Sequence, residues 1–137
     1  MNTHTLANKS FWRRLCKKSD LVVNSGVVAL SDDVQIALFY VADEQRIYAL
    51  ENRDPLSGAN VIGRGIIGNL AGEPVIASPL YKQHFRLTDG ACLEDERLRL
   101  RVWPARLSGD AVEVKLDAAS SGVRSTLLPM EALSCPI

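Results

Sequence analysis

The sequence predicts an all-β domain, an antiparallel β-sandwich or barrel, because short apolar runs alternate with turn residues along most of the chain. Two further observations favour this class. Gly, Asn, Asp and Ser recur at short intervals between the apolar runs, as they do in the turns of β proteins. No segment of convincing length carries apolar residues at helical spacing. With 137 residues, the chain fits one domain that can bury about two-thirds of its unfolded surface.

The individual strands follow from the apolar pattern. Residues 34–40 carry apolar side chains on both faces, which is typical of a buried strand, and residues 46–50 complete a hairpin with them. Residues 98–103 alternate between charged and apolar side chains, which predicts a strand with one solvated face. The remaining predicted strands are residues 27–30, 73–77, 84–87 and 111–116.

The ends of the chain differ in composition from its middle. We expect residues 1–10 to form a flexible N-terminus and residues 11–116 to form the domain. Residues 117–137 begin with a run rich in Ala, Ser and Gly, and we expect a C-terminal tail with one helical turn, either mobile or packed on a neighbour.

Charge and cysteine content limit the possible partners and compartment. The chain has 16 basic and 16 acidic residues, so it lacks the basic excess of a nucleic-acid-binding protein, and its zero net charge does not oppose association with a protein. The N-terminus lacks the apolar core of a signal peptide, and the longest apolar run, residues 36–42, is far below the ~20 residues that span a bilayer. Cys16, Cys92 and Cys135 are an odd number and lie far apart. We therefore expect a cytoplasmic protein without membrane contact.

Two loop segments carry the most informative pattern in the chain. Residues 52–59 read Asn-Arg-Asp-Pro-Leu-Ser-Gly-Ala, and residues 78–90 read Ser-Pro-Leu-Tyr-Lys-Gln-His-Phe-Arg-Leu-Thr-Asp-Gly. This arrangement resembles a Rieske site, whose usual form is Cys-x-His, a spacer, and Cys-Pro-x-His before a short aromatic strand and a Gly turn. The resemblance implies a Rieske-like [2Fe-2S] ferredoxin fold with a small loop-bearing β-subdomain at about residues 51–91.

The metal ligands of that pattern are missing from this chain. A Rieske cluster is held by two Cys thiolates on one iron and two His imidazoles on the other. The four ligand positions fall at Asn52, Asp54, Ser78 and Tyr81, and none of these side chains is a thiolate or an imidazole. We therefore expect no cluster and no bound metal. A mononuclear metal bound through Asp54 and His84 is the alternative.

A narrower resemblance lies within the Rieske pattern. The runs at residues 52–68, 72–85 and 90–95, above all Ser-Pro-Leu-Tyr-Lys-Gln-His-Phe, resemble the small subunits of assimilatory NAD(P)H-dependent nitrite reductase. Those subunits are similar to Rieske ferredoxins and characteristically lack the cluster ligands. The resemblance implies a role in reducing nitrite to ammonia, with flavin, an iron–sulfur cluster and siroheme in the large partner subunit. It implies no cofactor and no catalytic residue in this chain.

Without metal, the two loops need another means of closure. Asp54 can accept hydrogen bonds from backbone N–H groups, and Ser78 can bond to nearby backbone, as Ser often does in turns. Tyr81 can fill the volume that a cluster would occupy.

We also expect the loops to form the surface that binds the large subunit. Aromatic anchors within a polar surround are the usual composition of a binding hot spot. A free-standing Rieske-fold binding or regulatory module without a cluster is the alternative function, and the missing ligands disfavour an electron carrier. The predicted partner-binding residues are Ser57, Gly58, Asn60, Tyr81, Lys82, Gln83, His84 and Phe85.

Other motifs have simpler interpretations. Residues 63–68 match Gly-x-Gly-x-x-Gly, but this motif binds a dinucleotide only between a strand and a helix, and residues 69–74 leave no room for a helix. We expect a flexible inter-loop segment there. The alternating Arg97, Arg99 and Arg101 predict a solvated strand face or a contact with an acidic partner.

Overall fold

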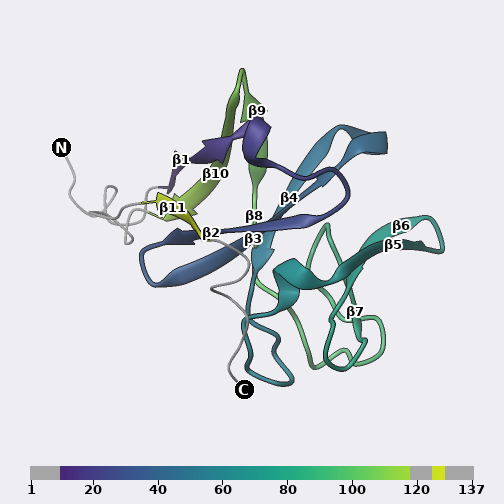
Figure 1. Ribbon diagram of the computed structural model, residues 1–137. Coiled ribbons are helices and arrows are strands. Elements are labelled where there is room, and N and C mark those ends of the chain that lie inside the picture. Colours follow the sequence, from purple (N-terminus) through teal and green to yellow (C-terminus); the bar gives the residue numbers. More distant parts are fainter. Residues whose placement is uncertain (1–9, 118–124, 129–137) are drawn as a thin grey trace.

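The computed structural model in Figure 1 describes residues 10–117 and 125–128. Their strands pair antiparallel and form three sheets. The first sheet, in the order β1-β10-β9, contains β1 (Ser10–Lys17), β9 (Ala105–Ser108) and β10 (Ala111–Asp117). The second, in the order β11-β2-β3-β4-β8, contains β2 (Gly26–Ser31), β3 (Val34–Val41), β4 (Arg46–Glu51), β8 (Val102–Trp103) and β11 (Ser125–Leu128). The third, in the order β5-β6-β7, contains β5 (Ile66–Leu70), β6 (Glu73–Ala77) and β7 (His84–Arg86).

Helical structure within the described ranges is limited to three short 3-10 turns, so the all-β prediction is confirmed. These turns are η1 (Lys18–Asp20), η2 (Ala42–Glu44) and η3 (Ile62–Arg64). No helix in this part of the chain is long and apolar enough to cross a membrane.

Strand β3 lies at the centre of the molecule because both of its faces are buried. Ile36 and Leu38 pack into the core between the first two sheets, together with Val112 and Val114 of β10. Ala37 and its neighbours on the opposite face pack toward the third sheet. Successive side chains of a strand point to opposite faces, so one apolar strand connects the two cores. The predicted buried strand at residues 34–40 is confirmed.

The second core supports the loop-bearing subdomain. Phe39 of β3 packs there with Ile62, Ile76 and Phe85, which are all 0% exposed. These side chains fix η3 and the third sheet against the sandwich. The first loop lies between β4 and η3, and the second loop lies between β6 and β7 of the third sheet. Figure 1 shows the β5-β6 hairpin projecting from this part of the molecule.

The glycines of the Gly-x-Gly-x-x-Gly motif serve packing. A Cβ atom on Gly63 would lie 2.5 Å from Cγ2 of Val28, and one on Gly65 would lie 2.3 Å from the carbonyl oxygen of Ala77. The motif runs from η3 directly into strand β5, so no helix follows it. The prediction that no helix follows residues 63–68, which a dinucleotide site would require, is therefore confirmed. The predicted flexible inter-loop segment is wrong, because residues 66–70 form a paired strand.

Gly63 offers a direct test of this packing. Gly63→Ala should lower the free energy of unfolding by about 1–3 kcal/mol, because the new methyl group overlaps the Val28 side chain in a closed core. Gly72→Ala is the control, because it removes a glycine from the same subdomain without a steric clash. A Cβ atom on Gly72 would meet nothing within 4 Å, so this variant measures only the cost of the positive φ. Urea unfolding of the three proteins measures the difference, and equal midpoints for Gly63→Ala and the wild type would contradict the packing role.

Several other strand predictions are confirmed and some are wrong. Strands β2, β4, β6, β7 and β10 lie where the pattern predicts them, within one residue at each end. Residues 98–103 are mostly irregular, and only Val102–Trp103 is a strand, because Leu98 and Leu100 pack into the subdomain core instead of continuing a ladder. Strands β1, β5 and β9 were not predicted. The C-terminal tail contains β11, which pairs with β2. Residues 1–9, most of the predicted flexible N-terminus, lie outside the described residues.

The arginine stripe is likewise not a strand face. Arg97 pairs with Asp95 through its Nη2 atom at 3.0 Å, and Arg101 stacks on the Trp103 ring at 4.6 Å from its centroid. Both contacts join residues two positions apart, and of residues 97–103 only Val102–Trp103 is a strand.

Candidate functional site

Asp54 is the central polar residue of the first loop. Its side chain is 0% exposed, and Oδ1 accepts hydrogen bonds from the backbone N–H groups of Leu56 at 2.8 Å and Ser57 at 3.3 Å. Its own backbone closes the loop: the Asp54 N–H donates to the carbonyl oxygen of Ala59, and the Gly58 N–H donates to the carbonyl oxygen of Asp54. An Asp side chain that bonds backbone two residues ahead is a common turn device, and the predicted role of Asp54 is confirmed.

Ser78 connects the second loop to the first. Its hydroxyl group donates to Oδ2 of Asp54 at 2.5 Å, and both side chains are almost fully buried. The same oxygen accepts the backbone N–H of Leu80 at 3.4 Å, which is the predicted local bond. The Asp54–Ser78 contact itself was not predicted. We call this pair the loop strut, because it joins the two loops at positions where a Rieske protein has metal ligands.

Asn52 fixes the start of the first loop to the body of the protein. It is 1% exposed; its Nδ2 donates to Oε1 of Gln35 at 2.8 Å, and its Oδ1 accepts the N–H of Gly63 at 2.7 Å. The side chain therefore bonds to β3 on one side and to η3 on the other. At three of the four ligand positions, uncharged or carboxylate side chains satisfy one another and the backbone.

Tyr81 departs from its predicted role. Its side chain is 60% exposed, so it does not fill the volume between the loops. The reason is the tight second loop, in which Ser78 N–H donates to the carbonyl of Gln83 and Lys82 N–H donates to the carbonyl of Ser78. Lys82 adopts a φ of 65°, and the resulting turn directs Tyr81 outward.

The remaining predicted partner-binding residues are divided by their burial. Phe85 is 0% exposed and lies in the subdomain core, so its side chain is not part of the exposed surface of the loops. The other predicted residues are exposed or half-buried, namely Ser57, Gly58, Asn60, Lys82, Gln83 and His84.

His84 is held by a contact that the sequence did not predict. Its Nδ1 lies 2.6 Å from Oε2 of Glu94, and its backbone N–H donates to Oε1 of the same residue at 2.8 Å. Asp54 and His84 therefore have separate partners, and no group of three His, Cys, Asp or Glu side chains suited to a metal ion occurs among the described residues. Burial raises the pKa of the nearby Cys92 thiol, which disfavours its thiolate form.

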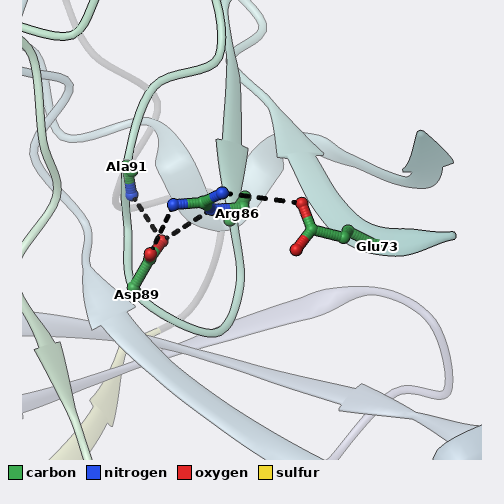
Figure 2. Close-up of polar contacts among 4 residues, drawn as sticks. All are labelled: Glu73, Arg86, Asp89 and Ala91. Atoms are coloured by element: carbon green, nitrogen blue, oxygen red, sulfur yellow. Dashed lines mark hydrogen bonds and ion pairs between the residues drawn. The ribbon is translucent and has the colours of Figure 1, made fainter. Parts of the chain in front are cut away.

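The turn after the second loop depends on an ion pair, drawn in Figure 2. The Arg86 guanidinium donates to both carboxylate oxygens of Asp89, at 3.0 and 2.6 Å, and Asp89 Oδ1 also accepts the N–H of Ala91 at 3.0 Å. The hydrogen bond from Arg86 holds the pKa of the Asp89 carboxyl below its usual value. Glu73 lies 3.6 Å from the other side of the guanidinium. Gly90, with a φ of 78°, completes the turn against the backbone of Leu100.

These residues do not fit a [2Fe–2S] cluster. None of the four positions presents a sulfur or imidazole ligand, and iron–sulfur clusters of this class require both. The space between the loops is crossed by the loop strut. The arrangement closes the loops and presents an outer surface.

Comparisons with known proteins agree with this geometry. Residues 11–115 match the family model described as a Rieske-like [2Fe-2S] domain. The chain is 40% identical over 106 residues to the nitrite reductase (NADH) small subunit of Salmonella typhimurium, covering 77% of this chain and 98% of that protein. The solution structure of the corresponding Escherichia coli protein superposes with a TM-score of 0.72 at 38% identity, covering 78% of this chain and 97% of that one.

A further relative differs in its chain organisation. The nitrite reductase [NAD(P)H] large subunit of Klebsiella oxytoca is 39% identical over 103 residues, which is 75% of this chain but 11% of that protein. The extent of these matches, together with the Rieske-like architecture, shows that this chain belongs to the Rieske-like [2Fe-2S] domain family, among the small subunits of NADH nitrite reductase.

Proposed function

We propose that this chain is the non-redox accessory subunit of an NAD(P)H-dependent nitrite reductase and binds the large subunit through its two loops. The observation that carries the proposal is the loop strut: loops that would hold a cluster are closed instead by Asp54 and Ser78. Flavin, an iron–sulfur cluster and siroheme belong to the large subunit, which reduces nitrite to ammonia in the cytoplasm.

The Klebsiella relative supports the choice of partner. There, a segment homologous to this chain forms part of the large-subunit polypeptide. Two domains that are joined in one polypeptide in one organism and are separate chains in another commonly bind each other. The domain and the large subunit are therefore expected to form a complex when they are separate.

The outer surface of the loops supports the choice of interface. Leu56, Leu80 and Tyr81 are 50%, 41% and 60% exposed. Leu56 and Leu80 both donate their backbone N–H to the loop strut, so the strut holds the apolar groups of both loops in place. Apolar and aromatic side chains at the tip of a rigid loop pair are suited to a hot spot, with Lys82 and Asn60 in its polar surround.

Tyr81→Ala tests this interface. We expect affinity for the large subunit to fall by about 10- to 100-fold, since Tyr is a frequent hot-spot residue. The melting temperature of the isolated small subunit should not change, because the side chain is exposed. Isothermal titration of purified large subunit measures the affinity.

Two further results decide the interpretation of this variant. Tyr81→Phe keeps the ring and serves as the matched control, for which we expect most of the affinity to remain. Wild-type affinity for Tyr81→Ala would place the interface elsewhere. Failure of the wild-type chain to bind at all would favour the alternative of a free-standing binding module.

A further inference from the structure

Strand β5 has an open edge of unusual composition. It ends the order β5-β6-β7, and no strand in residues 10–117 or 125–128 pairs with its other side. Its sequence, Ile-Ile-Gly-Asn-Leu, carries no charge. Edge strands of soluble proteins usually carry charged residues, prolines or covers that prevent pairing with another chain. The edges of the first sheet follow this rule, with Arg14 and Lys17 on β1 and Arg106 on β9.

The outward hydrogen-bonding groups of β5 can be assigned from Pro74. Residues facing each other in an antiparallel pair alternate between hydrogen-bonded and non-bonded pairs. Pro74 has no N–H, and its carbonyl accepts from Leu87 on the β7 side at 3.0 Å, so its pair with Asn69 is a non-bonded one. The N–H and C=O of Asn69, and by the same alternation those of Ile67, therefore point away from β6.

The side chains beside this edge are apolar and accessible. Ile66 is 70% exposed and Leu70 is 40% exposed, and both lie on the same face of the strand as Gly68. A Cβ on Gly68 would meet only Val75 Cγ2, at 3.9 Å, so the space above it can take a large side chain of a neighbouring strand. The edge thus provides main-chain groups for affinity and alternate apolar positions for specificity.

The edge is continuous with the loop surface. Ile66 pairs with Ala77, which immediately precedes Ser78 of the loop strut. An extended segment lying along β5 would therefore run toward the loop that carries Leu80 and Tyr81. This continuity points to the molecule that binds the loops.

The size of the edge argues against a second copy of this chain as the occupant. Pairing of five residues gives a contact about 17 Å long and only one strand wide. A stable protein–protein interface is much broader and buries roughly 1,200–2,000 Å² of surface in total. Two copies joined only through β5 fall short of that requirement. A segment of a partner already bound at the loops needs no such area, because its addition is then intramolecular.

We propose that the large subunit adds an extended, uncharged segment to the β5 edge, with β-branched or aromatic side chains facing Ile66 and Leu70. This inference rests on the proposed function and adds a second, main-chain element to the interface. The partner segment pairs with the outward groups of Ile67 and Asn69.

Amide hydrogen exchange tests the pairing directly. In the isolated small subunit, the Ile67 and Asn69 amides should exchange rapidly, and in the complex with the large subunit their protection should rise about tenfold or more. A complex that forms while both amides remain unprotected would overturn the β5 inference and leave the proposed function intact. Protection in the isolated chain that grows with its concentration would identify a second copy as the occupant and overturn the inference as well.

Two pairs of variants locate the effect. Asn69→Pro removes the outward N–H, whereas Asn69→Ala keeps it; both lose the Asn69 Oδ1 contact to Gly72 N–H. We expect at least about tenfold weaker binding of the large subunit for Asn69→Pro than for Asn69→Ala.

The second pair places a charge beside the strand or away from it. Ile66→Lys should weaken binding similarly, whereas Val22→Lys, which places the same charge at a 53% exposed position outside the third sheet, should not. Equal affinities within each pair would contradict strand addition, and absence of any complex with the wild type would contradict the proposed function itself.

Discussion

Asp54→Ala should lower the free energy of unfolding of the small subunit by roughly 3 kcal/mol or more, because it removes a buried carboxylate and its hydrogen bonds. The side chain is 0% exposed and accepts from two backbone N–H groups and from the Ser78 hydroxyl. The Ser78 hydroxyl would be left buried without this acceptor, and the two backbone N–H groups would lose theirs. Thermal and urea unfolding of the purified chain measures the loss.

The Ser78 partner allows the strut itself to be measured. Ser78→Ala leaves Oδ2 of Asp54 without the hydroxyl and should cost about 2 kcal/mol. The double variant should cost less than the sum of the two single ones, by about 0.5–2 kcal/mol, because the contact is lost only once. Additive effects would show that the two residues act independently and that the strut does not hold the loops together.

Phe85→Ala should be equally severe, with a loss of about 3–5 kcal/mol, because it leaves a cavity in a closed core. Phe85 is 0% exposed and packs with Phe39, Ile76 and Leu100. Much of the stability of a domain of this size would be lost.

The neighbouring aromatic residue provides the contrast. Tyr81 lies four positions earlier and is 60% exposed, so Tyr81→Ala should leave the unfolding free energy nearly unchanged while weakening the complex. Parallel denaturation and binding measurements on the two variants separate core from interface. A stable Phe85→Ala protein with weakened partner binding would show that Phe85 belongs to the interface.

The sequence predicts the fold well where hydrophobic pattern and turns act locally. The apolar run of β3 and the hairpin with β4 follow directly from residue order. Residues 98–103 mislead because alternation predicts a ladder only if a neighbouring strand is available, and Leu98 and Leu100 instead cover the subdomain core. Strand β5 has a glycine and an exposed pattern, so its pairing with β6 depends on the hairpin around Gly72 and not on its own composition.

The site is predictable in its frame and less so in its contacts. The positions of Asn52, Asp54 and Ser78 follow from the Rieske-like spacing, and their hydrogen-bonding capacity follows from residue type. The Asp54–Ser78 contact and the His84–Glu94 contact join residues 24 and 10 positions apart, so only the folded chain brings them together. Tyr81 and Phe85 are both aromatic, but Tyr81 is exposed and Phe85 is buried. The turn at Lys82 lies between them and directs Tyr81 outward.

The accessory role is tested most directly by the rate of NADH-dependent nitrite reduction by the large subunit, purified without this chain and then supplied with it. We expect low turnover by the large subunit alone and full turnover when the small subunit is added in equal amount. Identical turnover in both preparations, with no complex detected, would contradict an accessory role in nitrite reduction.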